Sequence, residues 1–190
     1  NRRDIQLLSY YNDGGPHVGD YMAEFYNCNF ERNDDFSIDD MLASITMWDV
    51  EGVKIGDCIF ENNATNTWAY QGGAISTINA SYRVADNPNL TARDGCEFKG
   101  YYDAIRSENL LCSPTLKHIE IKKATFTDNY HAIYLAEPTN ARITYNDIHI
   151  ANQLSPSSFP PLFQPARYGI YIDGDATYAI HNNVLKTALR

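Results

Sequence analysis

An acidic stretch near the N-terminus carries side chains of the kind that bind metal ions. The segment NDDFSIDD places four carboxylates within a few residues of one another. Hard cations such as Ca²⁺ bind several oxygen ligands of this type at once. The segment lacks the glycine and the terminal glutamate of an EF-hand loop, so a solvated acidic loop is the alternative interpretation. Ca²⁺ is therefore the one candidate cofactor, with Asp34, Asp35, Asp39 and Asp40 as its ligands.

Acid–base groups suited to polysaccharide chemistry are present but are not grouped by their spacing. Elimination next to a carboxylate needs a base, often Arg or Lys, and a cation that neutralises the carboxylate. Arg106, Arg142 and Arg167 are available, but spacing gives none of them a partner. Hydrolysis needs two converging carboxylates. Asp173 and Asp175 lie in a DGD tripeptide that follows a predicted strand and indicates a turn first.

Cysteines offer either packing or one redox pair. The chain has four, and three of them occupy one position of the repeat described below. No CxxC or Cys/His cluster is present, which excludes a typical zinc site. The three are interpreted as small buried hydrophobic residues, and one oxidised pair between neighbouring strands is the alternative. They are Cys28, Cys58 and Cys96, whereas Cys112 lies in a predicted loop.

A short repeating unit positions these side chains. It has an apolar residue five before a large apolar anchor and a small or amide residue two before that anchor. Arg93 alone breaks the apolar rule. The unit recurs as Phe25/Cys28/Phe30, Ile55/Cys58/Phe60, Arg93/Cys96/Phe98, Ile121/Ala124/Phe126, Ile143/Asn146/Ile148 and Ile180/Asn183/Leu185. A second apolar run follows most units, beginning at Ser44-Ile45, Ala74-Ile75, Ala104-Ile105, Ala132-Ile133 and Gly169-Ile170.

Alternation within each unit predicts strands that stack on the next unit. Apolar and polar residues alternate with period 2, and Asn, Asp or Gly separate the strands. A unit this small cannot bury its apolar side alone. We therefore predict an all-β fold, a right-handed parallel β-helix (solenoid) of about six coils, over residues 23–190, with 1–22 as a lead-in or a preceding partial coil. An antiparallel β-sandwich is the rival fold, but it does not predict columns of like residues.

The predicted stack makes two columns inside the cylinder. The anchor residues form a continuous aromatic stack, and the small residues give way to Asn146 and Asn183, whose amides could hydrogen-bond between coils. Both columns test the fold directly, because only stacked coils bring these residues together.

Long loops are expected on one edge of the cylinder. They span 31–44, 61–74 and 149–167, leave the coils at one register, and flank a shallow saddle over the third and fourth coils. Aromatic side chains in such a place suit stacking on sugar rings. The alternative is that apolar loop residues pack on the wall as a flap. The candidate ligand-binding residues are Trp68, Tyr70, Tyr101, Tyr102, Tyr130 and His131.

Charge and hydropathy exclude two classes of partner. The formal net charge is -9 and the basic residues are scattered, so a nucleic-acid partner is not expected. No apolar run approaches the length of about 20 residues that spans a bilayer. The chain begins at Asn1 without Met, and we interpret it as a fragment of a larger protein.

Three segments carry a resemblance to a known family. MWDVEGVKIGDCIFENN, NYHAIYLAEPTNARITYNDI and YGIYIDGDATYAIHNNVL resemble right-handed parallel β-helix repeat proteins, which share the coil of pectate lyases and polygalacturonases. More narrowly, they are similar to large secreted proteins of Bacteroidota-type bacteria that use type IX secretion. The resemblance covers roughly residues 23 to 187. It implies a secreted or cell-surface location on the bacterial outer surface, and flanking domains or secretion machinery as partners.

The resemblance leads to two functional hypotheses. The first is a non-catalytic extracellular module, either a structural stalk or an adhesion module for carbohydrate or protein. The alternative is a polysaccharide lyase or glycoside hydrolase acting on an acidic polysaccharide, in which Ca²⁺ at the acidic stretch would hold a uronate. In either case the open strand edges at both ends of the stack predict a covering segment or partner. Truncation there should cause aggregation, whereas deletion of 151–165 should be tolerated.

Overall fold

The computed structural model describes residues 4–8, 23–33, 43–63, 72–86, 95–110, 116–137, 139–150, 167–174 and 177–187. The protein is all-β: every regular element in these residues is a strand. None of the described residues forms a helix that could cross a membrane. The strands are β1 (Ile5–Leu8), β2 (Ala23–Tyr26), β3 (Asn29–Arg32), β4 (Ala43–Gly56), β5 (Ile59–Asn62), β6 (Gly73–Ala85), β7 (Glu97–Lys99), β8 (Asp103–Glu108), β9 (Lys117–Lys122), β10 (Thr125–Asn129), β11 (His131–Ala136), β12 (Thr139–Thr144), β13 (Asp147–Ile150), β14 (Tyr168–Asp173), β15 (Thr177–His181) and β16 (Val184–Thr187).

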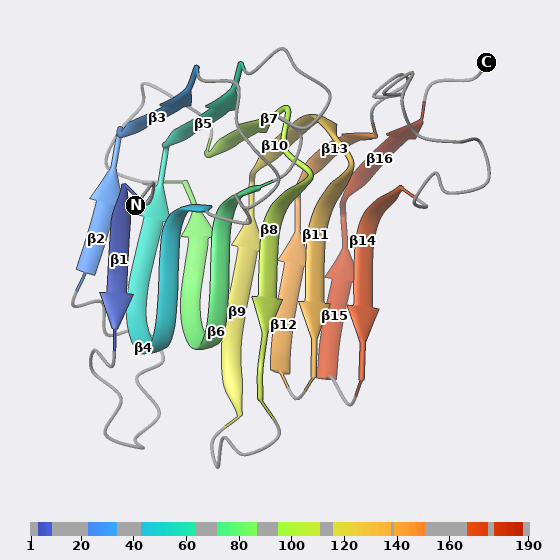
Figure 1. Ribbon diagram of the computed structural model, residues 1–190. Helices are drawn as coiled ribbons and strands as arrows, with labels where there is room; N and C mark the ends of the chain where they lie inside the picture. Colours follow the sequence, from blue (N-terminus) through green and yellow to red (C-terminus); the bar gives the residue numbers. More distant parts are fainter. Residues whose placement is uncertain are drawn as a thin grey trace, which may run out of the picture.

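The strands form two parallel sheets (Figure 1). The smaller sheet has the order β16-β13-β10-β7-β5-β3. The larger sheet bends along its length, because β4 and β6 are long enough to contribute to two faces. The first half of β6 pairs with β8 and its second half with β9. The chain thus crosses the first face, the second face and the smaller sheet, and then returns to the first face.

We call one such circuit a rung, and each rung pairs in parallel with the next. For example, β8, β9 and β10 pair with β11, β12 and β13, which pair in turn with β14, β15 and β16. Figure 1 shows the rungs following one another from β1 to β16, which lie at opposite ends of the stack. The predicted all-β character and parallel pairing are therefore confirmed.

The predicted aromatic column is present between the two sheets. Phe30, Phe60, Phe98 and Phe126 are stacked, with ring centroids 4.6, 4.9 and 4.9 Å apart. The last three rings are almost completely buried. A column of isoleucines runs beside it in the larger sheet, where Ile45, Ile75, Ile105, Ile133 and Ile170 are register partners. Like side chains therefore stack because the parallel register places equivalent residues of successive rungs side by side.

One assignment in the repeat was wrong. Arg93 was placed in the column that contains Ile55 and Ile121, but their register partner is Val84, which is fully buried. The prediction counted back a fixed five residues from Phe98. In the structure β6 ends at Ala85, and the extra residues of this repeat follow that strand. Arg93 itself lies outside the described residues. The column is consequently apolar without exception.

A left-handed backbone conformation marks the same corner of every rung. The residue before each small or amide position has a φ between 52° and 110°. Gly95 requires glycine there, because a Cβ atom would lie 1.6 Å from the carbonyl oxygen of Lys123. The other positions hold residues with side chains, which tolerate this region at some cost. They are Asn27, Asp57, Lys123, Tyr145 and Asn182.

The small-residue column contains thiols at one end and amides at the other. Cys28, Cys58 and Cys96 are free thiols. A hydrogen bond from Cys96 lowers the pKa of the Cys58 thiol to about 7, and the same bond raises the pKa of Cys96. Asn146 donates from Nδ2 to Oδ1 of Asn183 at 2.9 Å, which confirms the predicted amide contact between rungs. Cys112 lies outside the described residues.

The predicted long loops begin at equivalent places. They follow β3, β5 and β13, which all belong to the smaller sheet, and they precede β4, β6 and β14, which share the first face of the larger sheet. Most residues of these loops lie outside the described part of the chain. The structure therefore fixes where the loops leave and return, and this edge adjoins the surface discussed next.

Candidate functional site

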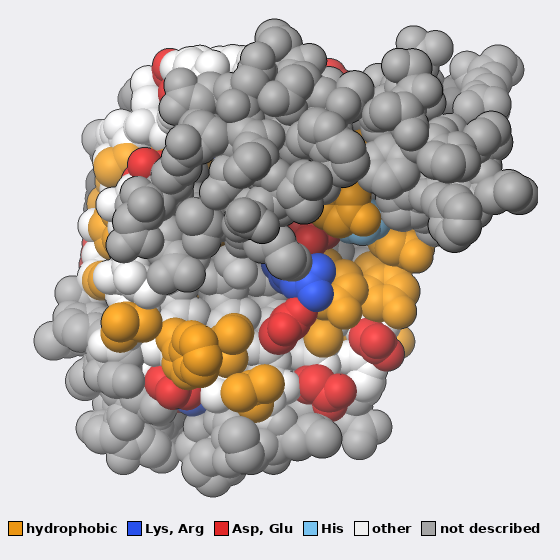
Figure 2. Space-filling model, viewed as in Figure 1, with side chains coloured by type: hydrophobic (Ala, Val, Ile, Leu, Met, Phe, Trp, Pro, Cys, Tyr) orange, Lys and Arg blue, Asp and Glu red, His pale blue; other side chains and the backbone are white. Residues whose placement is uncertain are grey.

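The outward side of β8, β11 and β14 carries a cluster of aromatic and charged side chains. Their inward residues, such as Ile105 and Ile133, are fully buried, so the alternate residues face outward. Register aligns Arg106 with Tyr134 and Tyr171 across the three strands. Figure 2 shows a basic group on this face, with acidic side chains close to it and hydrophobic side chains on either side.

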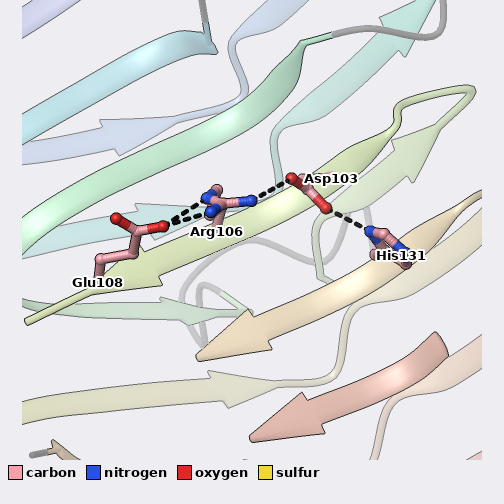
Figure 3. Close-up of polar contacts among 4 residues, drawn as sticks. All are labelled: Asp103, Arg106, Glu108 and His131. Carbon is pink, nitrogen blue, oxygen red and sulfur yellow. Dashed lines mark hydrogen bonds and ion pairs between the residues drawn. The ribbon is translucent and has the colours of Figure 1, made fainter. Parts of the chain in front are cut away.

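Arg106 is the centre of the polar contacts (Figure 3). Its Nη1 donates to Oδ2 of Asp103 at 3.1 Å, and its Nε donates to Oε1 of Glu108 at 2.8 Å. Nη2 donates to the same oxygen of Glu108. Burial alone would lower the pKa of Arg106, but the hydrogen bonds that the guanidinium donates to the two carboxylates, together with their negative charges, outweigh it and the pKa is raised. The guanidinium therefore stays charged and is held by both acids.

Asp103 also holds His131. Nδ1 of His131 lies 2.6 Å from Oδ1 of Asp103, and both side chains are 9 % exposed. The imidazole stacks on Tyr168 with centroids 4.8 Å apart, and Tyr102 meets it edge-on at 4.9 Å. The backbone N–H of His131 donates to the carbonyl of Tyr102 at 2.7 Å. The carboxylate and the surrounding rings thus fix the position of the imidazole.

The two outward tyrosines stack along the direction of the rungs. The ring centroids of Tyr134 and Tyr171 lie 5.2 Å apart, and the two ring planes are nearly parallel, with an angle of 7° between them. The guanidinium of Arg106 lies 4.5 Å from the Tyr134 centroid, within cation–π distance. Burial raises the pKa of Tyr134 and of Tyr102. The ring of Tyr134 thus contacts both Tyr171 and Arg106, and its phenol stays protonated at neutral pH.

Trp48 stands on the same outward side, towards the other end of the sheet. It is 49 % exposed, and its register partners are Leu8 on β1 and Ile78 on β6. Ile78 is in turn the partner of Glu108. Neighbouring strands lie about 4.8 Å apart, which places Trp48 about 10 Å from Glu108 along the sheet. Within the described residues no second ring stacks on the Trp48 indole.

The structure brings together half of the predicted ligand-binding residues. Tyr102, Tyr130 and His131 lie in one aromatic group, where Tyr102 and Tyr130 have centroids 5.3 Å apart. Tyr101 is fully buried in the core and takes no part in this surface. Trp68 and Tyr70 lie outside the described residues.

Several members of the cluster were not predicted. Two of them, Tyr134 and Tyr171, carried a signal in the sequence, because each directly follows an aligned isoleucine, as Arg106 does. Arg167 lies near the cluster, with its guanidinium 5.1 Å from the Tyr130 centroid. Arg142 lies on β12, on the second face of the larger sheet. The residues that sequence reasoning missed are Trp48, Asp103, Glu108, Tyr134, Tyr168 and Tyr171.

The candidate cation ligands Asp34, Asp35, Asp39 and Asp40 lie outside the described residues. Across the ranges that the structure describes, no three His, Cys, Asp or Glu side chains are grouped closely enough to hold a metal ion. Asp173 is among the described residues. It is the register partner of Ala136, which in turn is the partner of Glu108, so the three form one row on the outward side of the sheet. Asp175 is not among the described residues.

No protein-family model, no curated protein and no solved structure matches this chain.

Proposed function

We propose that the chain is a carbohydrate-binding module built as a right-handed parallel β-helix of about six coils, with its long loops on one edge. It would belong to a larger protein of the bacterial outer surface, secreted or retained there and flanked by further domains. The parallel register of successive rungs and the resemblance of the repeat to secreted β-helix proteins support this proposal. The glycan would lie across the strands on the outward side of β4, β6, β8, β11 and β14.

The arrangement of Trp48, Arg106, Tyr134 and Tyr171 on this side carries the proposal. An exposed indole offers its ring to the apolar face of a sugar. The Arg106–Glu108 pair and the protonated phenol of Tyr134 supply hydrogen-bond donors and acceptors next to it. At about 4.8 Å per strand, the strands β4 and β11 that carry Trp48 and Tyr134 lie about 14 Å apart across the sheet. A flat face of this length suits an extended oligosaccharide.

The charges of the site favour a neutral glycan. Arg106 already binds two carboxylates, so its positive charge is balanced before any ligand arrives. The whole chain carries a net charge of -9, which repels an acidic polysaccharide at long range. An acidic ligand would also lie next to Glu108, at an unfavourable distance for two like charges. Hydroxyl groups, by contrast, can accept from the phenols and donate to the carboxylates.

The same contacts favour binding over hydrolysis. A glycoside hydrolase needs two carboxyl groups that face a common space on either side of the glycosidic bond. Asp103 and Glu108 instead lie on two sides of the Arg106 guanidinium and both bind it. Asp103 is also committed to His131 at 2.6 Å. These acids position the arginine and the imidazole, which suits a rigid binding surface.

A glycan array of neutral and acidic oligosaccharides tests the proposal, followed by titration calorimetry on the best ligand. Trp48→Ala should weaken that binding about tenfold, equivalent to about 1.4 kcal/mol. Leu8→Ala is the matched control, because Leu8 is the register partner of Trp48 and is 58 % exposed. Binding that is equal in both variants would contradict the proposal. Absence of any glycan binding would favour a structural stalk.

Incubation of the same glycans with the protein, with and without Ca²⁺, separates binding from catalysis. We expect the oligosaccharides to be recovered intact. Release of an unsaturated uronide would instead indicate a lyase, and shortened saturated products would indicate a hydrolase.

A further inference from the structure

A row of outward side chains crosses three neighbouring strands of the larger sheet. Trp48 on β4 is the register partner of Ile78 on β6, and Ile78 is the register partner of Glu108 on β8. Successive residues of a strand face opposite sides of the sheet. The residues directly before these three are all buried, and they are Met47, Thr77 and Ser107. The row therefore faces outward and presents an aromatic ring, an aliphatic side chain and a carboxylate, in that order.

Glu108 uses one of its two carboxylate oxygens to bind Arg106. Nε and Nη2 of the guanidinium both donate to Oε1. Figure 3 shows the second oxygen pointing away from the guanidinium. In the part of the chain that the structure describes, nothing donates to this Oε2 atom, and the Glu108 side chain is 36 % exposed. Arg106 thus fixes the carboxylate and leaves a charged acceptor at the surface.

Ile78 places an apolar surface directly beside that acceptor. Neighbouring strands lie about 4.8 Å apart, so Ile78 is one strand away from Glu108 on one side and from Trp48 on the other. Its side chain is half-buried, so part of it is open to contact. The adjacent outward row on the same three strands is polar throughout, and it consists of Thr46, Ser76 and Arg106. An apolar contact next to a carboxylate is therefore special to the row that contains Trp48.

An acetamido group has both halves of this arrangement. A secondary amide is trans, so its N–H and its methyl group lie on the same side of the C–N bond, next to each other. When the N–H points at Oε2 of Glu108, the methyl group can lie against Ile78. A hydroxyl group offers a donor without a methyl group, and a deoxy sugar offers a methyl group without the donor. The pair of residues is thus matched by the acetamido group as a unit.

We propose that the glycan bound at this site contains an N-acetylated hexosamine, whose ring stacks on Trp48, whose amide N–H donates to Glu108 and whose methyl group packs on Ile78. This inference rests on the proposed glycan-binding function and assigns its specificity. A hydrogen bond to a charged acceptor is stronger than one between neutral groups. The acetamido group is itself neutral, whereas a uronate would bring a second negative charge next to Glu108.

A glycan array followed by calorimetry on a matched pair of ligands tests this specificity. The glycans that bind on the array should carry an acetamido group. The chitin and cellulose tetrasaccharides differ only in carrying an acetamido or a hydroxyl group at the same carbon. We expect the chitin tetrasaccharide to bind at least about tenfold more tightly, from the added methyl contact and the charged hydrogen bond.

Equal binding of the pair, or array ligands that all lack an acetamido group, would overturn the specificity and leave glycan binding in place. An array without any bound glycan would instead contradict the proposed function itself. The chitosan tetrasaccharide, which carries free amino groups, is the third ligand. It should bind more weakly than the chitin tetrasaccharide, because it lacks the methyl group. Tighter binding of the amine would overturn the proposal in favour of simple charge attraction.

Two variants assign the preference to the row. Ile78→Thr removes apolar surface and keeps a β-branched residue. In Glu108→Gln the guanidinium of Arg106 would hold the amide oxygen, so the NH₂ group would face the ligand and could not accept. Each variant should lower the ratio of the chitin to the cellulose affinity at least about threefold. Ser76→Ala, at an outward position in the adjacent row, is the control and should keep the ratio.

The ratio of two affinities measured on one variant has its own internal control. Partial unfolding of a variant lowers the binding of both tetrasaccharides by the same factor, so it leaves the ratio unchanged. A ratio that stays at the wild-type value in both Ile78→Thr and Glu108→Gln would overturn the proposal.

Discussion

Phe60 and Phe98 stack with their ring centroids 4.9 Å apart and an angle of 5° between the rings, although 38 residues separate them in the sequence. Each ring is also in contact with a further ring on its other side. The column therefore joins rungs that are distant in sequence, and its interior members should matter most for stability.

Phe98→Ala should lower the free energy of unfolding by about 3–5 kcal/mol, because it removes a buried ring and leaves a cavity between Phe60 and Phe126. Urea denaturation followed by far-ultraviolet circular dichroism measures this change. Leu116→Ala is the control, since Leu116 is 47 % exposed and its truncation should cost less than about 0.5 kcal/mol. Equal losses in the two variants would contradict a packed column.

Asn146→Asp should destabilise the protein by about 3 kcal/mol at neutral pH. Nδ2 of Asn146 donates to the carbonyl of Ile121 at 3.0 Å and to Asn183, and Oδ1 accepts from the N–H of Ala124 at 2.9 Å. A carboxylate loses both donations and is buried. Asn183→Asp, in the partly buried last rung, should cost less. Urea unfolding tests this order: the unfolding midpoint of Asn146→Asp should be lower than that of Asn183→Asp.

Lys117 and Glu51 form a buried ion pair at 2.8 Å, with side chains 1 % and 5 % exposed. Lys117→Met should destabilise the chain by about 3–5 kcal/mol, since it leaves an uncompensated buried carboxylate. Adding Glu51→Leu to that variant should restore most of the loss, because two apolar groups of similar volume replace the pair. A double-mutant cycle measures both effects. Purely additive losses would show that the two charges are not coupled.

Gly95→Ala and Tyr145→Gly should have opposite effects at one equivalent corner. The new methyl group at Gly95 would collide with the carbonyl oxygen of Lys123, so we expect a loss of more than about 1 kcal/mol. Tyr145 has a φ of 59° and is 55 % exposed, so glycine should relieve strain there and leave stability unchanged or slightly higher. Thermal unfolding of the two variants, compared with the wild type, gives the sign of each effect.

Alkaline pH should unfold the protein through its buried tyrosines. Burial raises the pKa of Tyr82, whose hydroxyl lies 2.6 Å from Oγ of Ser107. An unfolded tyrosine ionises near pH 10, so this stabilisation is complete below about pH 10 and is lost above it, by up to about 1.4 kcal/mol per pH unit for each such group.

Tyr82→Phe should therefore flatten the fall in stability above about pH 10, at a cost of about 1 kcal/mol near neutrality from the lost hydrogen bond. Urea denaturation at several alkaline pH values measures the slope. Tyr178→Phe, at an exposed ring, is the control and should leave the slope as it is. An unchanged slope in Tyr82→Phe would contradict the prediction.

The core could be predicted from sequence because burial constrains it in every rung. The spacing of Phe60, Phe98 and Phe126 identified the column, and the aligned isoleucines identified the first face of the larger sheet. Val84 was missed because the residues that follow β6 shift its distance from Phe98. A fixed count fails wherever a loop of variable length lies inside the counted interval.

The surface cluster could be predicted only in part, because outward positions do not share one residue type. Tyr102, Tyr130 and His131 were found from their closeness to the expected loop edge, whereas Tyr134 and Tyr171 were not. Their shared register with Arg106 becomes informative only once β8, β11 and β14 are known to be adjacent. Tyr101 shows the converse error, since an aromatic residue next to that edge faces the core.

The left-handed corner has a consequence for how such a protein can change over time. Asp57, Lys123 and Tyr145 make the same bend with unrelated side chains, so at every corner except that of Gly95 the bend depends on backbone conformation rather than on a particular residue. Whole repeats could therefore be duplicated or lost without redesigning the joint between them. The length of the stack of rungs, and with it the reach of whatever it presents, is open to evolution in steps of one repeat.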